Sequence, residues 1–559
     1  KLNKRLLWYE EGKEMAKSLF DKTYIGKMKL KNRIFMSPMG TTGEADGAYC
    51  NEGIDYFEER AKGGAGLIIT GANVVSTKYE PRPCTELSDF HHVERLNMLI
   101  ERCHAYGAKV CVQLSPGLGR QQFTDPFTPP YSAGSVGAFW FPNLICKPFS
   151  KEDIHYLVEK VGYSASLAVN AGADCVELHA YGGYLLDQFH SVQWNNRTDE
   201  YGGDIHGRLR LTLEVIEEVR KQCGRDFIID VRISGDEYSD GGLTLNDMIY
   251  VSKQLEKATV DFIHVSGGNT IKRGSSMPAS GTAPAPHMHA SEEIKKHVSI
   301  PVATVSRINE PWVADELIAN GKTDICMIGR PNLCDSEFAN KAKEGRIDDI
   351  RPCIGCGRCL TGIMFGKPIS CTVNPAVEKE EIEEASVKKK VLVIGGGPAG
   401  MEVAYVAKKR GHDVVLCEKT DRLGGQLLIA CVPIGKQEIT KVVKYMKSQL
   451  TGVDVRLNTT VTKEMIENEF KDYEVITTVG ATPKEIESYK VFKQTMTADD
   501  ILSGKKFPGR KIVIIGGGSV GCETADYLAP LINDLFSTNR DITLIEMTNG
   551  LMTDRKSVV

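Results

Sequence analysis

The sequence predicts an α/β protein in which an N-terminal (β/α)8 TIM barrel precedes Rossmann-like dinucleotide-binding modules. Two observations predict this architecture. Short apolar runs alternate with helix-like segments eight times between Asn32 and about Arg330, and two glycine-rich strand–turn–helix units follow further along the chain. Eight strand–helix units favour parallel strands and a closed barrel, with a doubly wound open sheet as the alternative. We expect four regions, at 1–350, 351–388, 389–508 and 509–559.

The eight apolar runs have the length of single strands. Helical periodicity fills the segments between them, for example over 89–106, 151–171, 207–222 and 310–320. The runs are RIFMSPM, GLIITGA, KVCVQL, DCVELHA, FIIDVRI, DFIHVS, PVATVS and DICMIG. The working face of such a barrel is formed by the C-terminal ends of its strands, so the residues that end these runs are the first candidates for a site.

Composition excludes several classes of protein. The 559 residues carry a net charge of -4 without a basic tract, so nothing indicates nucleic-acid binding. The longest apolar runs are too short to span a membrane, and the charged N-terminus lacks a signal-peptide core. Sixteen cysteines without a secretion signal favour a reducing, cytoplasmic compartment. The oligomeric state stays open, with a homo-oligomer included.

The strand ends predict a site for a phosphorylated planar cofactor. A glutamine and an arginine there can hydrogen-bond a flat heterocycle, and the small residues after the first two strands leave room for its ring. Two arginines follow the last two strands, where such barrels usually bind phosphate. The predicted cofactor contacts are Pro38, Met39, Gly40, Ala72, Gln113, Arg232, Ser306, Arg307, Gly329 and Arg330.

The fourth strand carries the candidate catalytic pair. His179 ends the strand, and Tyr184 follows a Gly182-Gly183 turn. A histidine can donate a hydrogen bond to a carbonyl oxygen, and a phenol is a plausible general acid. Packing at the barrel rim is the alternative explanation for both side chains.

Four cysteines form a C-x2-C-x2-C-x11-C array after the barrel, at Cys353, Cys356, Cys359 and Cys371. Three thiolates within seven residues of a Gly- and Pro-rich loop can converge on a metal. Four thiolates suit either Zn²⁺ or an iron–sulfur cluster. Since zinc has no redox chemistry, the cluster is favoured between two redox modules.

Two glycine-rich units follow a charged linker. In the first, Gly395, Gly397 and Gly400 form G-x-G-x-x-G between a strand and a helix, and Glu418 ends the next strand. Gly516, Gly518, Gly521 and Glu546 repeat this pattern. A carboxylate at that strand end favours NADH over NADPH. The further predicted contacts of the first unit are Pro398, Ala399, Gly425 and Gln426. Because the chain stops at Val559, soon after Glu546, we expect the C-terminal module to be incomplete.

Residues 20–375 resemble the Old Yellow Enzyme family, in the iron–sulfur-containing branch of 2-enoate and 2,4-dienoyl-CoA reductases. The resemblance lies in KNRIFMSPMG at 31–40, VQLSPGLGR at 112–120, the segment 176–210 with NNRTDEYGG, and MIGRPNLCD at 327–335. It implies FMN in the barrel and a [4Fe–4S] cluster on the four cysteines. LGGQL at 423–427 and VGATP at 479–483 resemble two-dinucleotide flavoproteins, which implies FAD.

The sequence departs from this family at two positions. Many relatives have a second His or Asn where this chain has Gly182, and often a Thr or Cys where it has Gly40. The further candidate donors to a substrate carbonyl are Arg120, Gln113 and His264. His287 and His289 are either substrate contacts or solvated side chains.

The combined expectation is an NADH-dependent ene-reductase. Electrons would pass from NADH to FAD, to the [4Fe–4S] cluster and to FMN, which delivers hydride to an α,β-unsaturated acid, ketone or thioester. In the resembling enzymes, the residues at His179 and Tyr184 polarise the carbonyl and protonate the adjacent carbon. The alternatives are a trimethylamine-dehydrogenase-like amine oxidoreductase and an electron-transfer partner without a substrate of its own.

Overall fold

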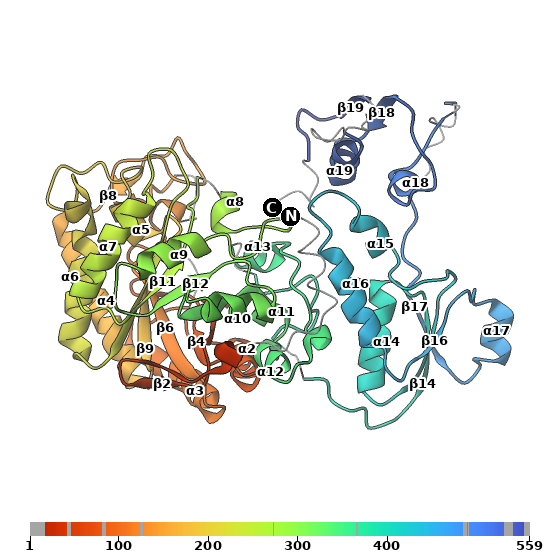
Figure 1. The fold of residues 1–559 in the computed structure, drawn as a ribbon, viewed down its shortest axis with the longest axis horizontal. Coiled ribbons are helices and arrows are strands. Elements are labelled where there is room, and N and C mark those ends of the chain that lie inside the picture. The colour runs from red at the N-terminus through yellow and green to blue at the C-terminus, as the bar shows by residue number, and fades with distance from the viewer. Residues whose placement is uncertain are drawn as a thin grey trace. The chain divides into compact units, whose positions relative to one another are not determined.

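A computed structural model describes the chain except at 1–16 and a few short internal and C-terminal segments. The described residues are 17–41, 46–80, 85–122, 127–271, 273–364, 367–378, 381–483, 489, 491–492, 494–529 and 540–552. The chain forms two compact units, Lys1–Lys379 and Glu380–Val559 (Figure 1). The cysteine array therefore belongs to the first unit. No described helix is both long and apolar enough to cross a membrane.

The first unit is a closed parallel barrel, as the sequence predicts, and the eight apolar runs each contain one strand. The sheet order is β4-β3-β13-β12-β11-β10-β9-β6, and pairing of β4 with β6 closes it. The strands are β3 (Ile34–Met36), β4 (Leu67–Ile69), β6 (Lys109–Ser115), β9 (Cys175–Ala180), β10 (Ile228–Ser234), β11 (Phe262–Ser266), β12 (Val302–Val305) and β13 (Ile325–Ile328). The short strand β5 (Asn73–Val74) pairs with β6, and the hairpin of β1 (Thr23–Ile25) and β2 (Met28–Leu30) precedes the barrel.

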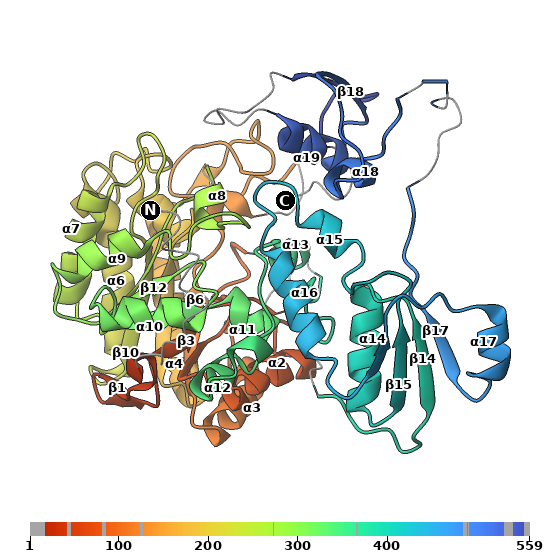
Figure 2. The ribbon, with the colours of Figure 1, turned by 45° about the vertical axis from the view of Figure 1, so that its right-hand side comes forward.

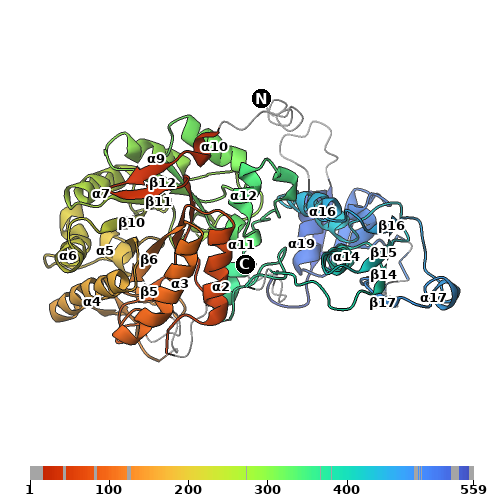
Figure 3. The same cartoon turned by 90° about the horizontal axis from the view of Figure 1, so that it is seen from below.

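Amphipathic helices cover the outside of the strands (Figure 3). Local signals set their ends: Ser150 and Asp153 form a capping box at the start of α4, and Thr244 and Asp247 form another at α7. The barrel helices are α2 (Asn51–Lys62), α3 (Val93–Ala105), α4 (Lys151–Asn170), α5 (Leu185–His190), α6 (Ile205–Cys223), α7 (Leu245–Lys257), α8 (Arg273–Ser276), α9 (Met288–Lys295), α10 (Pro311–Ala319), α11 (Arg330–Cys334), α12 (Phe338–Lys343) and α13 (Arg358–Met364).

The interior of the barrel is layered. Strand side chains alternate between the interior and the helix layer. The layer nearest the N-terminal ends of the strands is apolar and includes Phe35, Leu67, Cys111 and Phe262. Polar side chains replace apolar ones further along β6, β9, β10 and β11, toward the C-terminal ends. The fold therefore closes one end of the barrel with a packed core and leaves polar groups at the other.

The second unit contains a parallel sheet of order β16-β15-β14-β17 and a separate strand pair, β18-β19 (Figure 2). The strands are β14 (Lys390–Ile394), β15 (Asp413–Cys417), β16 (Asp454–Arg456), β17 (Glu474–Thr477), β18 (Lys511–Ile515) and β19 (Asp541–Ile545). The helices are α14 (Pro398–Lys409), α15 (Leu427–Ala430), α16 (Ile439–Ser448), α17 (Lys463–Asn468), α18 (Ala498–Leu502) and α19 (Ser519–Leu528). Strand, turn and helix follow one another at β14–α14 and again at β18–α19, as the two glycine motifs predict.

Candidate active site

A cavity of about 340 Å³ opens at the C-terminal ends of the barrel strands. The residues that the sequence predicted for the barrel cofactor, together with the candidate catalytic pair, all line it. These residues are Pro38, Met39, Gly40, Ala72, Gln113, His179, Tyr184, Arg232, Ser306, Arg307, Gly329 and Arg330. They come from seven strand ends, and Ser266 adds the eighth, β11, so residues of all eight strand ends meet at one concave surface, where a planar ligand can contact several of them together.

His179 is held as a neutral imidazole. It lies at the end of β9 and is 5% exposed. Burial and then the positive charge of Arg232 lower the pKa of His179 to about 3. Its Nδ1 atom has no hydrogen-bond partner among the described residues. A neutral imidazole with an unpaired nitrogen at a cavity wall is suited to hydrogen-bond a ligand.

The turn after β9 brings Tyr184 back toward His179. Gly182 and Gly183 both have left-handed backbone angles, with φ of 74° and 77°. The carboxylate of Asp187 accepts a hydrogen bond from the Gly183 amide at 2.7 Å and stabilises the turn. The rings of His179 and Tyr184 consequently lie 4.7 Å apart, centroid to centroid. A ligand group in the cavity can therefore reach both side chains.

The phosphate end of the cavity is built from backbone as well as arginines. Ser306 and Arg307 follow β12 with φ of 95° and 52°, which is rare for residues with side chains. Successive residues in such conformations can aim backbone N–H groups at an anion. Arg307 and Arg330 are held in place by donating to Thr282 O at 3.1 Å and to Pro278 O at 2.9 Å. These groups fit a phosphate ester.

Glycine at Gly71 is required by close packing of the first two strand ends. A Cβ atom at Gly71 would lie 2.5 Å from the Gly40 Cα and 2.9 Å from the Met39 carbonyl oxygen. The two backbone segments can approach this closely only without a side chain. The cavity floor after β3 and β4 is therefore formed by backbone, which leaves room for a ring.

Some cavity residues were not predicted from the sequence. Leu360, Ile363 and Lys367 belong to the cysteine segment and form part of the cavity wall. Tyr181 also lines it; the Arg232 guanidinium lies 4.3 Å from the Tyr181 ring centroid. An aromatic residue next to a predicted strand end was the available signal for Tyr181, whereas the return of the cysteine segment to the barrel has no local signal.

Two of the candidate carbonyl donors lie outside the cavity lining. Arg120 does not line the cavity, because its Nε donates to Gly137 O at 3.0 Å and its guanidinium lies over Trp194. His264 lies below the cavity floor with no exposed surface. Of the further candidate donors, only Gln113 lines the cavity.

His287 and His289 also lie outside the cavity lining. His287 is buried, and its Nδ1 atom lies 3.3 Å from the Tyr238 hydroxyl. His289 Nε2 lies 3.4 Å from the same hydroxyl. Both histidines thus lie within reach of the Tyr238 hydroxyl.

The four cysteines of the array are spaced too widely for one zinc ion. A tetrahedral Zn–S site with bonds of about 2.3 Å would hold its sulfurs roughly 4 Å apart. Among the described residues, which include all four cysteines, no three of these thiols lie within 4.8 Å of one another. They nevertheless act on one another electrostatically, since Cys353, Cys356 and Cys371 all influence the pKa of Cys359. This wider arrangement fits a polynuclear cluster.

The second unit brings its first set of predicted residues together. Glu418 follows β15 and accepts a hydrogen bond from the Gly396 amide at 2.7 Å, within the glycine-rich turn. Gly397 precedes α14, whose first residues are Pro398 and Ala399. A Cβ at Gly400 would lie 1.8 Å from the Gly395 oxygen, and one at Gly425 would lie 2.9 Å from the Gly397 Cα. Gln426 donates to Ala481 O at 2.8 Å.

The second glycine motif has the same geometry. Glu546 accepts from the Gly517 amide at 2.7 Å, and a Cβ at Gly521 would lie 1.9 Å from the Gly516 oxygen. Gly518 precedes α19 as Gly397 precedes α14. Both glycine motifs of the second unit therefore present a glycine-rich turn at a helix N-terminus with a carboxylate beside it. This is the arrangement that binds dinucleotides.

Fold and sites together define a flavin-dependent oxidoreductase in which an FMN-type barrel and dinucleotide-binding units occur in one chain. The sequence profile of the NADH:flavin oxidoreductase / NADH oxidase family matches residues 18–349. The pyridine nucleotide-disulphide oxidoreductase profile matches residues 364–492 and 390–557. The chain belongs to the NADH:flavin oxidoreductase / NADH oxidase family.

Curated relatives resemble the chain over nearly its whole length. It is 36% identical over 575 residues to the cinnamate reductase of Clostridium sporogenes, covering 97% of this chain and 84% of the relative. It is 37% identical over 559 residues to the NADH oxidase of Thermoanaerobacter brockii, again covering 97% and 84%. A 2-naphthoyl-CoA reductase in complex with 2-naphthoyl-CoA superposes with a TM-score of 0.87 at 27% identity, covering 96% of this chain and 84% of that one.

Proposed function

We propose that this protein is an NADH-dependent ene-reductase that saturates the C=C bond of an α,β-unsaturated carboxylate, ketone or thioester. The observation that carries the proposal is that His179 and Tyr184 share one cavity with the groups suited to bind FMN. The relatives named cinnamate reductase and 2-naphthoyl-CoA reductase support this substrate class.

The two side chains would divide the work on the substrate. His179 is neutral, so its ring N–H group can donate a hydrogen bond to the carbonyl oxygen without bringing a full charge into the buried site. Tyr184 would supply the proton to the carbon next to that carbonyl. The 4.7 Å separation of the ring centroids supports this division, because it would let the two groups act on adjacent atoms of one conjugated system.

The barrel residues would hold FMN through both of its ends. Gln113 and Arg232 would hydrogen-bond the polar edge of the ring, while Ser306, Arg307, Gly329 and Arg330 would bind the phosphate. When bound, FMN supplies the hydride that adds to the alkene. The protein would also position the substrate, because the side chains around the cavity would determine against which face of the flavin ring the substrate can lie.

Cys353, Cys356, Cys359 and Cys371 would hold a [4Fe–4S] cluster. The wide spacing of the thiols supports this proposal, as does the position of α13. Leu360 and Ile363 of α13 line the barrel cavity, and Cys359 precedes Leu360 in the same helix. The cluster ligands thus adjoin the wall of the FMN site, as a one-electron relay requires.

The second unit would supply the reducing equivalents. The Gly395–Gly400 turn with Glu418 would bind FAD, and the Gly516–Gly521 turn with Glu546 would bind NADH. The complete order that we propose is NADH, FAD, cluster, FMN and substrate. Each of these steps is testable by removing one group and measuring the reduction of the next.

The direct experiment is anaerobic turnover with NADH and a panel of unsaturated substrates. We expect stoichiometric NADH consumption and a saturated product with at least one enoate, enone or enoyl thioester. A panel member without the C=C bond serves as the control. NADH oxidation that occurs only with oxygen, with no saturated product from any substrate, would contradict the proposal.

A further inference from the structure

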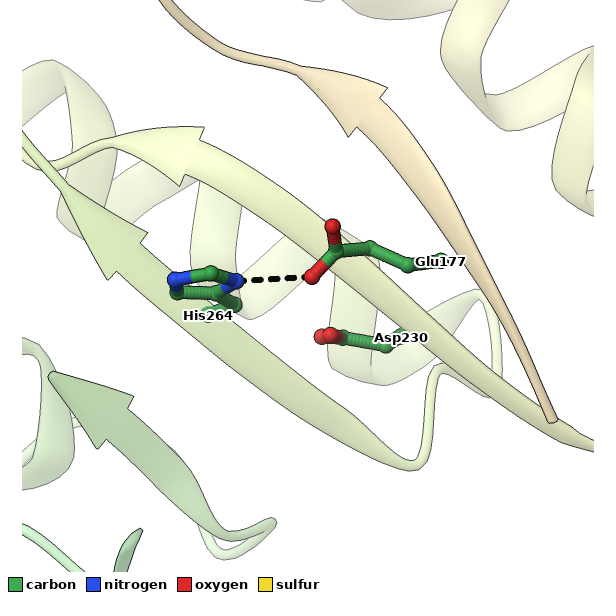
Figure 4. Close-up of side chains that lie close together, drawn as sticks. All are labelled: Glu177, Asp230 and His264. Carbon is green, nitrogen blue, oxygen red and sulfur yellow. Dashed lines mark hydrogen bonds and ion pairs between the residues drawn. The ribbon is translucent and has the colours of Figure 1, made fainter. Parts of the chain in front are cut away.

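Four polar side chains form a continuous layer inside the barrel, of which Gln113 lines the cavity and the other three do not. They are Gln113 on β6, Glu177 on β9, Asp230 on β10 and His264 on β11. Gln113 is 3% exposed and the other three have no exposed surface. Backbone register pairs Gln113 with Glu177 and Glu177 with Asp230. Figure 4 shows the side chains of Glu177, Asp230 and His264 converging inside the barrel.

Glu177 is the acceptor at the centre of this layer. Gln113 Nε2 donates to its Oε1 at 2.5 Å, and His264 Nδ1 lies 2.7 Å from its Oε2. The first bond fixes the orientation of the Gln113 amide, because a flipped amide would aim its oxygen at a carboxylate. The side-chain oxygen of Gln113 is therefore available to a ligand in the cavity. It can accept a hydrogen bond from the ring N–H of a flavin, which lies between two carbonyl groups.

The two carboxyl groups of the layer differ in charge. Burial opposes ionisation of Glu177, but His264 and the hydrogen bonds that it accepts hold the pKa of its carboxyl below the usual range. Burial and then the charge of Glu177 raise the pKa of Asp230 well above its usual value. Asp230 therefore favours its protonated form and Glu177 its ionised form, so the negative charge of the layer is concentrated on Glu177.

That charge lies close to Arg232. Arg232 lines the cavity, is two residues from Asp230 on the same strand, and pairs in register with His264. Its positive charge helps to lower the pKa of Glu177. Among the described residues Arg232 forms no direct ion pair. The buried carboxylate of Glu177 therefore partly neutralises the positive charge of Arg232 without touching it.

We propose that Glu177 is a positioning residue for the flavin: it fixes the Gln113 amide and offsets the charge of Arg232, and so sets the affinity and reduction equilibrium of FMN. This inference rests on the proposed binding of FMN in the barrel cavity. It assigns a role to a residue that touches neither cofactor nor substrate.

A cation site is the competing explanation of the layer. The ligand atoms of Glu177, Asp230 and His264 lie within 4.8 Å of one another. However, the Gln113 amide already donates a hydrogen bond to one oxygen of Glu177, and the positive charge of Arg232 already interacts with this carboxylate. Both would oppose a second cation, so the observations favour a positioning role.

The test compares Glu177→Gln with Asp230→Asn in the full chain. Glu177→Gln removes the charge and lets the Gln113 amide flip. We expect at least tenfold weaker FMN binding and at least a tenfold shift of the reduction equilibrium toward reduced FMN, because Arg232 is no longer offset. For a two-electron couple this shift is about 30 mV. Asp230→Asn replaces a carboxyl group that favours its protonated form by a neutral amide of similar shape, so both quantities should stay within threefold of wild type.

FMN labelled with ¹⁵N at N3 distinguishes the barrel flavin from FAD during these measurements. We expect the N3 resonance to move in Glu177→Gln and to stay in place in Asp230→Asn. Wild-type values in Glu177→Gln would overturn the inference, as would equal shifts in both variants. A stoichiometric divalent metal that is lost in Glu177→Gln would also overturn it, in favour of the cation site.

Glu177→Asp is the second variant, to be measured if Glu177→Gln does not fold. It retains the charge but withdraws the carboxylate from Gln113 by one methylene. We expect at least tenfold weaker FMN binding with a reduction equilibrium within threefold of wild type. Unchanged FMN affinity in this variant would contradict the positioning role. Absence of FMN from the wild-type protein would instead refute the proposed function itself.

Discussion

The rings of His179 and Tyr184 lie 4.7 Å apart across the turn that follows β9, with an angle of 49° between their planes. The left-handed Gly182 and Gly183 make this approach possible, since the chain reverses within two residues. A donor and an acid are thereby held by one short segment. Their spacing depends on local backbone geometry and not on the loops that vary between barrels.

Replacing Tyr184 by Phe should separate the two halves of the catalytic cycle. We expect alkene reduction to slow by about 100-fold or more, which is the usual contribution of a general acid. Reduction of the protein by NADH should remain within twofold, because Tyr184 belongs to the barrel cavity and not to the glycine-rich turns of the second unit. Stopped-flow absorbance of the two half-reactions measures both rates. Equal loss in both would contradict the proton-donor role.

Gly182→Asn should restore a second carbonyl donor. A Cβ at Gly182 would have Tyr184 ring atoms at 3.9 Å as its nearest neighbours, and asparagine tolerates a φ of 74°. One additional hydrogen bond should raise kcat/KM for an enone about threefold to tenfold.

Gly183→Asn is the matched control for this substitution. A Cβ there would lie 3.1 Å from Thr270 Oγ1 and 3.2 Å from the Trp194 ring. We expect it to lower kcat/KM for the same enone. If Gly182→Asn lowered kcat/KM as much as Gly183→Asn, the space beside Tyr184 would not be available to a donor.

Gly71→Ala should damage the FMN site, whereas Gly40→Ala should not. The Cβ at position 71 would meet backbone atoms, the nearest at 2.5 Å, but the Cβ at position 40 would meet the flexible side chain of Ile363, with its nearest atom at 3.4 Å. Overpacking of this kind costs about 1–3 kcal/mol. Urea unfolding and the FMN content per chain measure the difference. Similar stability and FMN content in both variants would contradict this prediction, because they would show that the backbone after β3 and β4 can move to accept a side chain at position 71.

The pH dependence should reveal the neutral state of His179. With its pKa near 3, this residue should contribute no inflection to kcat/KM around pH 6.5. Its folded-state pKa is depressed, so its contribution to stability is full above about pH 6.5 and is lost as the pH falls toward 3. The expected slope is about 1 kcal/mol per pH unit in that window. His179→Asn should reduce this slope in urea titrations; an unchanged slope would mean that His179 is charged when folded.

Cys359→Ser should remove iron, whereas Cys223→Ser should not. Cys359 belongs to the four-cysteine array, while Cys223 ends α6 on the outside of the barrel. We expect iron and acid-labile sulfide to fall to less than half in the first variant and to stay at the wild-type level in the second. Zinc in place of iron in the wild-type protein would contradict the cluster.

The strands and most cavity residues could be predicted because each depends on local sequence. A buried parallel strand appears as an apolar run, and its last residues are the ones that reach the cavity; this is how Gln113 and Arg232 were found. The position of Arg120 outside the cavity lining has a physical cause. Arg120 is in the right segment, but its guanidinium turns away to Gly137 and Trp194.

What could not be predicted depends on contacts between distant segments. Ile363 and Lys367 reach the cavity only because the cysteine segment folds back onto the barrel. The local signal for Glu177 and Asp230 is an acidic residue in the middle of a buried strand, two residues before His179 and Arg232. Its meaning emerges only when β9, β10 and β11 are placed side by side.

The most direct measurement is a single turnover of the NADH-reduced protein mixed anaerobically with a cinnamate-type acid. A cavity that holds both FMN and the unsaturated carbonyl predicts reoxidation of the flavin together with one equivalent of saturated acid. A reduced flavin spectrum that persists with every unsaturated acid, ketone and thioester, and recovers only with oxygen, would contradict it.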